Sequence, residues 1–128
     1  MVFIDWFYPA FKAGGPIKSI FNLTQTLDGT FNIFIVTSDK DIDGTKLNVS
    51  LNETIEERGY DIIYLDSEHQ NSKQYKKFVD SFKPDFIYYN SLFSFKYTLL
   101  PYFLFKKREA ITSVLAPRGM LGKGAISI

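Results

Sequence analysis

The sequence of 128 residues contains no cysteine and only one histidine, His69. Without cysteine, neither a disulfide framework nor a thiolate metal site can form, and a single histidine excludes a histidine-rich metal centre and a catalytic histidine pair. A basic excess is also missing, because the formal net charge is +1, whereas nucleic-acid-binding surfaces usually show such an excess. We therefore expect no nucleic-acid partner. His69 lies in a polar stretch at the start of a predicted helix, where we expect it on the surface.

Long apolar stretches are absent as well. No run of about 18 apolar residues occurs, and the N-terminus lacks the basic segment and apolar stretch of a secretory signal. Together with the lack of cysteine, this pattern predicts a cytoplasmic protein. What the sequence does contain is typical of one soluble domain, since 45% of its residues are apolar and 23% are charged. Its length suffices for a core of its own.

Five short apolar runs alternate with segments of helical periodicity. The apolar runs predict strands at about residues 1–7, 31–38, 60–66, 85–90 and 110–116. The periodic segments predict helices at about residues 17–27, 75–82 and 94–108. Short strands that are apolar on both faces are typical of an α/β domain, in which a Rossmann-like parallel sheet carries helices on both faces.

The acidic residues give little sign of a metal site. The stretch DKDIDG, residues 39–44, imitates the start of a calcium loop, but Ser50 stands where that loop needs a bidentate glutamate. We interpret residues 39–59 as a long polar loop with room for one short element and with a solvated acidic start, and we expect no metal. Asp5 falls within the first predicted strand, where a carboxylate needs a partner, and we expect it to cap or pair locally.

The segments that leave the strands carry the most unusual chemistry. In a parallel sheet, ligands bind beyond the carboxyl ends of the strands, and there the chain places YPAFKAGGP, NSLFS and APRGMLGKG. Gly14 and Gly15 stand between the first strand and a helix. A glycine pair at this place indicates either a tight turn or backbone that a ligand approaches closely. Exposed N–H groups at the start of a helix suit an anion or polar ligand.

Arg118 is the notable residue of the last of these segments, where it stands between Pro117 and Gly119. A guanidinium group beyond a buried strand can reach the cleft and bind phosphate or carboxylate in a bidentate way. The alternative is an arginine that caps the edge of the sheet.

The predicted helix at residues 94–108 is apolar at most positions and ends in three cations. A membrane contact through its aromatic residues and its basic end is one interpretation. Packing against the sheet is favoured for its central apolar residues, which are Leu99, Leu100, Phe103 and Leu104.

Four segments together resemble one family. In order and spacing, YPAFKAGGPIKSIFNL, VTSDKD, KPDFIYYNSLFS and VLAPRGMLGKGA are similar to the N-terminal domain of family 4 glycosyltransferases, which are retaining enzymes with the two-domain GT-B architecture. The resemblance extends from Phe7 to Ala125 and is weakest at about residues 45–75. It implies a hexosyltransferase-type enzyme that transfers a sugar from a nucleotide-sugar donor to a glycan or lipid-linked acceptor, as in the synthesis of surface polysaccharides.

The resemblance also implies which residues bind these substrates. Those implied to contact donor or acceptor are Gly14, Gly15, Lys18, Asn90, Ser91, Arg118 and Gly119. The first three lie near the donor diphosphate, although the family often carries arginine where this chain has lysine. The other four lie on the acceptor side. The nucleotide-sugar is a substrate, so no cofactor and no metal are implied, and the catalytic residues are not identified.

The length of the chain departs from the family pattern. GT-B enzymes place most of the nucleotide-sugar site on a second Rossmann-like domain, for which 128 residues leave no room. We therefore expect residues 1–128 to be the N-terminal, acceptor-side domain, inactive without the missing C-terminal, donor-binding domain. The complete enzyme is expected in the cytoplasm, with peripheral association at the inner face of the membrane.

A second interpretation is a non-catalytic, flavodoxin-like α/β module with a binding or regulatory role. A receiver domain of that type needs an acidic pair near the first strand, and Asp5 has no adjacent acidic partner. A module of this kind would need no partner domain.

Overall fold

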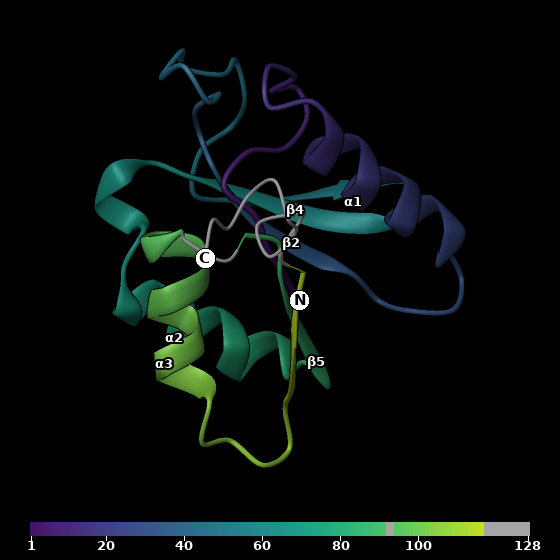
Figure 1. Cartoon of the computed structure of the whole chain (residues 1–128), viewed down its shortest axis with the longest axis vertical. Coiled ribbons are helices and arrows are strands. Elements are labelled where there is room, and N and C mark those ends of the chain that lie inside the picture. The colour runs from purple at the N-terminus through teal and green to yellow at the C-terminus, as the bar shows by residue number, and fades with distance from the viewer. Residues whose placement is uncertain (92–93, 117–128) are drawn as a thin grey trace, which may run out of the picture.

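The computed structural model describes residues 1–91 and 94–116. They form a six-stranded sheet with helices on both faces (Figure 1), which confirms the predicted α/β, Rossmann-like fold. In sheet order the strands are β3 (Thr54–Glu57), β4 (Tyr60–Leu65), β2 (Phe34–Ser38), β1 (Val2–Phe3), β5 (Phe86–Tyr89) and β6 (Thr112–Leu115). All neighbouring pairs are parallel except β3 and β4, which are antiparallel.

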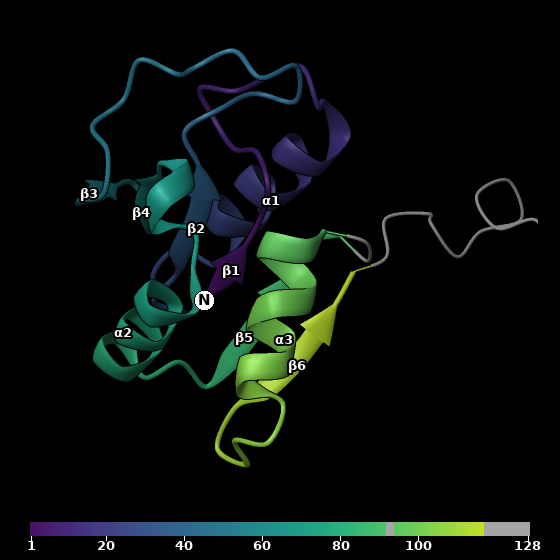
Figure 2. The ribbon, with the colours of Figure 1, turned by 90° about the vertical axis from the view of Figure 1, so that its left-hand side faces the viewer.

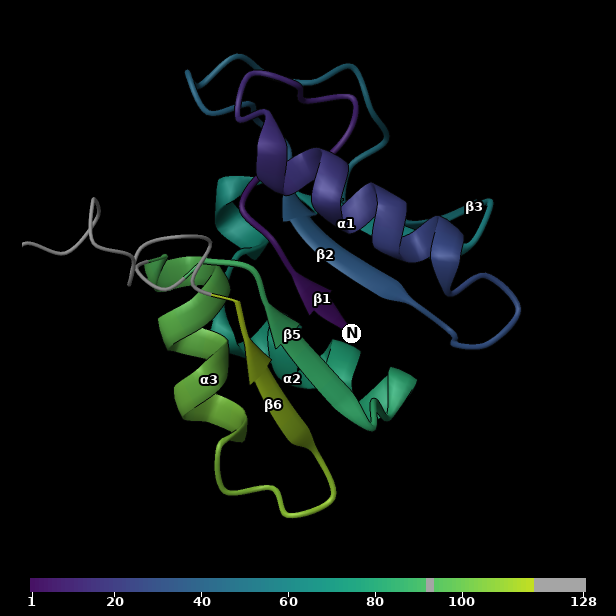
Figure 3. The same ribbon diagram turned by 45° about the vertical axis from the view of Figure 1, so that its right-hand side comes forward.

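Three α-helices and two short helical segments connect the strands. They are α1 (Gly15–Thr26), η1 (a 3₁₀ turn, Ser67–His69), α2 (Ser72–Phe82), η2 (a π-helical segment, Phe95–Leu99) and α3 (Leu100–Phe105). Figure 3 shows α1 along one face of the sheet, with α2 and α3 on the other. Pro101 is the second residue of α3, which directly continues the π-helical segment η2.

Alternate residues of the central strands build two cores. Phe3, Val36 and Ile63 point to one face and pack with Tyr75 and Val79 of α2. Their neighbours in the strands, among them Val2, Ile35 and Ile62, point to the other face and pack with Ile17 and Ile20 of α1. Because successive side chains of a strand alternate between faces, burial on both faces requires an apolar residue at every position.

The first strand is shorter than predicted. Pairing in β1 ends at Phe3, and only the N–H of Ile4 still donates to the carbonyl of Val36, at 3.2 Å. Phe7 is nonetheless fully buried, in the loop that leads from β1 to α1. A loop residue that contributes to the core and a strand residue produce the same apolar run in a sequence, so the run by itself did not locate the end of the strand.

The structure refines two further predictions. The short element within residues 39–59 is β3, an edge strand whose sequence, TIEE, is largely exposed and shows no apolar alternation. In the segment at 94–108, Leu100 and Leu104 pack against the core as predicted. Leu99 and Phe103, however, are 38% and 59% exposed, because the sheet contacts one side of this helical segment and these two residues lie on the other.

Candidate functional site

The carboxyl ends of β1 and β5 mark the point where the chain leaves the sheet toward opposite faces. From β1 it runs to α1 on one face, and from the neighbouring β5 it runs to η2 and α3 on the other (Figure 2). In open α/β sheets, ligands bind in the crevice that such diverging loops create. Of the predicted binding residues that the structure describes, Gly14, Asn90 and Ser91 lie on these two loops, and Gly15 and Lys18 lie in the first turn of α1.

Gly14 and Gly15 close the loop after β1 and differ from each other. Gly14 precedes α1 with φ at 71°, a conformation that favours glycine. The backbone turn therefore explains why this position is a glycine. Gly15 is the first residue of α1 and its φ lies outside that left-handed region. A Cβ atom added at Gly15 would meet no atom within 4 Å. A left-handed conformation and contacts with residues beyond its chain neighbours therefore do not account for glycine at position 15. The remaining local constraint is Pro16, because a helical residue with a side chain is disfavoured directly before a proline.

The loop that carries these glycines is anchored by Asp41. Oδ2 of Asp41 accepts hydrogen bonds from the N–H groups of Phe11 and Lys12, at 3.0 and 3.3 Å, and Oδ1 accepts one from the N–H of Ile42 at 2.7 Å. Burial by itself raises the pKa of Asp41, but the three backbone donors outweigh burial and lower it. The ammonium group of Lys12 also pairs with the Asp43 carboxylate. The loop after β1 and the loop after β2 are thus tied together.

This arrangement corrects the prediction of a solvated acidic loop. Asp41 is 3% exposed and Asp39 is 4% exposed, whereas Asp43 lies at the surface. The described residues contain no group of three or more acidic or histidine side chains that could hold a metal ion. The acidic start of this loop is therefore an anchor for neighbouring backbone.

Asp5 also behaves differently from the prediction. Besides a local interaction with its own backbone, its Oδ1 accepts a hydrogen bond of 2.5 Å from Oγ of Ser94, which follows 89 positions later in the chain. Ser94 Oγ in turn accepts from the N–H of Tyr97 at 3.1 Å and so caps η2. On the other side, Ser38 Oγ donates to the carbonyl of Asp5 at 2.9 Å. Burial raises the pKa of the Asp5 carboxyl, and the hydrogen bond from Ser94 opposes that rise.

Asp5, Ser94 and Tyr97 line a cavity of about 380 Å³ at this edge of the sheet. Its other walls come from the loops after β1, β2 and β4, through side chains that include Trp6, Lys40 and Gln70. Three larger hollows, of about 520, 600 and 450 Å³, involve residues at the amino ends of the strands, such as Asp61 in β4 and Asp85 directly before β5. We favour the smaller cavity as a binding site because the diverging loops meet there.

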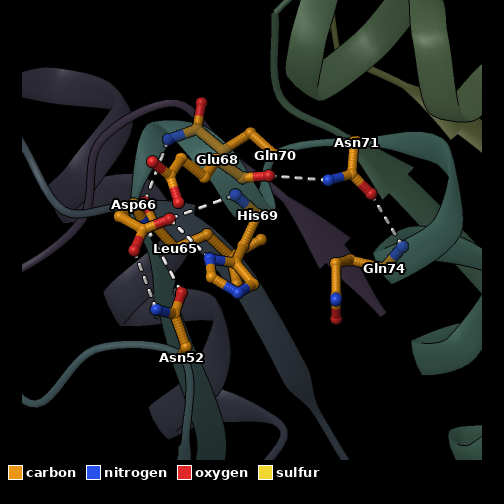
Figure 4. Close-up of polar contacts among 8 residues, drawn as sticks. All are labelled: Asn52, Leu65, Asp66, Glu68, His69, Gln70, Asn71 and Gln74. Atoms are coloured by element: carbon orange, nitrogen blue, oxygen red, sulfur yellow. Dashed lines mark hydrogen bonds and ion pairs between the residues drawn. The ribbon is translucent and has the colours of Figure 1, made fainter.

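The loop from β4 to α2 gives the cavity a rigid wall. Asp66 directly follows β4, and it accepts hydrogen bonds from the Asn52 side chain at 2.9 Å and from the N–H of His69 at 3.1 Å (Figure 4). The Asn52 amide and then the His69 ring lower the pKa of Asp66 to about 2. Gln70 donates to the carbonyl of Leu65. His69 is partly exposed, as the sequence predicted.

The remaining predicted site residues are distributed over the two loops and beyond. Lys18 is exposed in the first turn of α1, on the same element as Gly15. Asn90 is buried at the end of β5, where its N–H donates to the carbonyl of Phe3 at 3.2 Å. The carbonyl of Ser91 accepts a hydrogen bond from the Thr98 hydroxyl. Arg118 and Gly119 lie outside the described residues.

Several buried polar atoms near the cavity have no hydrogen-bond partner among the described residues. They are Oγ1 of Thr37, Oδ1 of Asp39 and the hydroxyl oxygens of Tyr75 and Tyr97. The rings of Tyr75 and Tyr97 are neighbours, with centroids 6.3 Å apart, but their hydroxyls do not make a hydrogen bond of good geometry. Burial, and then the nearby Tyr75, Asp5 and Asp39, raise the pKa of Tyr97 well above its usual value. The Tyr97 hydroxyl therefore stays protonated at neutral pH.

Sequence reasoning placed Ser94 in the NSLFS segment beyond the strands without singling it out, missed Tyr97 as a lining residue and gave Asp5 a local role. A carboxylate inside an apolar run, directly before an aromatic-rich loop, is the signal that pointed to Asp5. No pattern in the sequence pairs it with a serine 89 positions away.

Comparison with protein-family models, with curated proteins and with solved structures gives no significant match to this chain. Among the described residues, none of the helices is both long and apolar enough to pass through a bilayer.

Proposed function

We propose that this chain is a carbohydrate-active α/β domain whose ligands meet at the carboxyl ends of β1 and β5. More particularly, we propose the acceptor-side domain of a retaining glycosyltransferase similar to family 4. The observation that carries the proposal is Gly15, which has open space where a side chain would stand, at the start of a helix and on an anchored loop. The order of the four resembling sequence segments is the second support.

The proposed reaction gives Gly15 and Lys18 a chemical role. When the bond between the sugar and the nucleoside diphosphate breaks, its electron pair stays on the diphosphate, where negative charge develops. Free N–H groups at the start of α1 and the ammonium group of Lys18 are suited to stabilise that charge. A side chain at Gly15 would hold a phosphate or sugar away from these N–H groups. The acceptor-side assignment of Asn90, Ser91, Arg118 and Gly119 remains part of the proposal.

The proposal requires a second, donor-binding domain, so it is tested on a protein that joins residues 1–128 to the sequence encoded after Ile128. A screen of nucleotide-sugars with saccharide acceptors, which measures released nucleoside diphosphate, should identify one preferred donor. Release of diphosphate from no donor, or a gene without a second α/β domain, would favour the non-catalytic binding module instead.

A further inference from the structure

The continuous helical segment of η2 and α3 exposes apolar side chains. Phe95, Leu99 and Phe103 are 65%, 38% and 59% exposed. They follow one another at intervals of four residues, so they share one face of the segment. The opposite face packs on the core through buried residues such as Tyr97 and Phe105. In Figure 2, α3 lies in the foreground with β5 and β6 behind it. The segment is therefore apolar on the side away from the sheet as well.

The other two α-helices present a different outer face. The exposed residues of α1 and α2 are all polar or charged, apart from Gly15. Single exposed apolar residues are common on soluble proteins, whereas apolar residues that form one continuous face usually mark an interaction surface. Among the helices that the structure describes, only the segment of η2 and α3 has such a face.

Lysines flank this apolar face at both ends. Lys96 lies at its start, and Lys106 and Lys107 follow Phe103 by three and four positions. All three lysines are exposed, and in the part of the chain that the structure describes none of them forms an ion pair. Nζ of Lys106 lies 4.7 Å from the centroid of the Phe103 ring. No acidic residue occurs within residues 94–108. We call the three apolar residues and the three lysines together the basic apolar face.

An anionic lipid membrane suits this combination of side chains. In a helix that lies on a membrane, apolar side chains enter the boundary between headgroups and acyl chains, and lysines reach the lipid phosphates with their long side chains. The negative surface potential of such a membrane complements the charge of the lysines. The exposed side of a helix is convex, so a protein partner would need a matching groove, whereas a lipid surface adapts to it.

We propose that the basic apolar face docks the chain on an anionic membrane surface, with Phe95, Leu99 and Phe103 inserted between the headgroups and the lysines bound to lipid phosphates. The sequence alone favoured core packing for Leu99 and Phe103, and their exposure removes that argument. The proposal goes beyond the proposed function, because it applies to a transferase domain and to a non-catalytic module alike.

The test measures flotation of the 128-residue chain with two kinds of vesicle, phosphatidylcholine alone and phosphatidylcholine mixed with phosphatidylglycerol. We expect binding to the mixed vesicles that weakens as salt is added, because salt screens the lysines. Lys106→Gln combined with Lys107→Gln should weaken this binding by about fivefold per lysine. Phe103→Gln should weaken it by about tenfold, because the inserted phenylalanine ring is lost.

Each variant has a matched control on another part of the molecule. Lys46→Gln combined with Arg58→Gln removes the same charge near β3, at the opposite edge of the sheet from β6. Phe31→Gln changes a phenylalanine that is 50% exposed in the loop between α1 and β2. Both controls should bind the mixed vesicles like the unchanged chain. All variants should keep a melting temperature close to that of the unchanged chain, since every substituted side chain is exposed.

Four outcomes overturn the proposal. The unchanged chain does not bind the mixed vesicles, or the controls weaken binding as much as the variants do. The protein that includes the sequence encoded after Ile128 does not bind, which would show that the rest of the protein covers this face. Light scattering detects a dimer that Phe103→Gln dissociates, which would assign the face to a second copy of the chain. Sugar transfer is measured separately: vesicle binding without transfer leaves this proposal in place and overturns the proposed function.

Discussion

Two aspartates hold the loop after β1 in place, and their environments differ. Asp5 lies in this loop and binds Ser94, whereas Asp41 lies after β2 and binds backbone N–H groups of this loop. Asp41 accepts three backbone N–H groups, which lower its pKa against the effect of burial. Asp5 accepts one serine hydroxyl, and burial raises its pKa. A carboxylate that accepts three backbone N–H groups is stabilised as a charge and holds structure. A partly buried carboxylate whose pKa is raised costs stability as a charge, which is typical of residues kept for function.

The largest effect on stability is expected from Asp41→Ala. The substitution leaves the N–H groups of Phe11, Lys12 and Ile42 without their acceptor, and it should lower the free energy of unfolding by about 1–3 kcal/mol. Urea denaturation measures the change. Asp43→Ala is the control, since its ion pair with Lys12 is exposed and such pairs contribute little. Equal losses in both variants would show that charge rather than backbone anchoring matters.

Substitution by alanine should affect stability differently at Gly14 and Gly15, the two glycines at the end of the loop that Asp41 anchors. Gly14→Ala forces a side chain into a left-handed conformation at a cost of about 1–2 kcal/mol, whereas Gly15→Ala meets open space and should leave the melting temperature nearly unchanged. In the two-domain protein, Gly15→Val should abolish most sugar transfer while the domain stays folded. Normal transfer kinetics in Gly15→Val would reduce Gly15 to part of a turn.

The pH dependence of stability should separate the two carboxylates by sign. For Asp41 the pKa in the folded protein is below that in the unfolded chain, so its contribution is present above about pH 3.9 and is lost as the pH falls through the lower, folded value. For Asp5 the folded pKa is the higher one, so stability decreases as the pH rises from about 3.9 through that value.

The variants make this sign measurable by urea unfolding at several pH values. Relative to the unchanged chain, Asp5→Asn should gain stability between about pH 4 and 7. Asp41→Asn should lose stability relative to the same chain, with the difference disappearing toward low pH. Parallel pH profiles for the two variants would contradict the distinction between them.

The smallest effect is expected from free nucleotides. The start of α1 and Lys18 are exposed to water, where their charges are strongly screened. We therefore expect the 128-residue chain to bind nucleoside diphosphates with a dissociation constant in the millimolar range or weaker. This corresponds to a binding free energy of about 4 kcal/mol or less. Calorimetry with a panel of nucleotides tests this, alongside an assay for sugar transfer. Micromolar binding or clear turnover would mean that a complete donor site lies within these residues.

The sequence alone determined the features that arise from local chemistry. The spacing of Tyr75, Phe78, Val79 and Phe82 specified α2, because residues three and four apart share a helix face. The doubly apolar runs specified the inner strands of a parallel sheet. Glycine and proline next to a strand located the loop before α1. Each of these signals is complete within a dozen residues.

Only the tertiary structure decided which of these residues meet. The partner of Asp5 is 89 positions away, and Asp41 reaches back 30 positions to the N–H of Phe11. Such contacts depend on the strand order, which sets β1 between β2 and β5 and brings the loops that follow them together. For the same reason, the sequence did not identify the segment of β3 as a strand. Its pairing with β4, and not its own polar sequence, makes it one. Long-range pairing is a property of the whole sheet, and no short segment carries it.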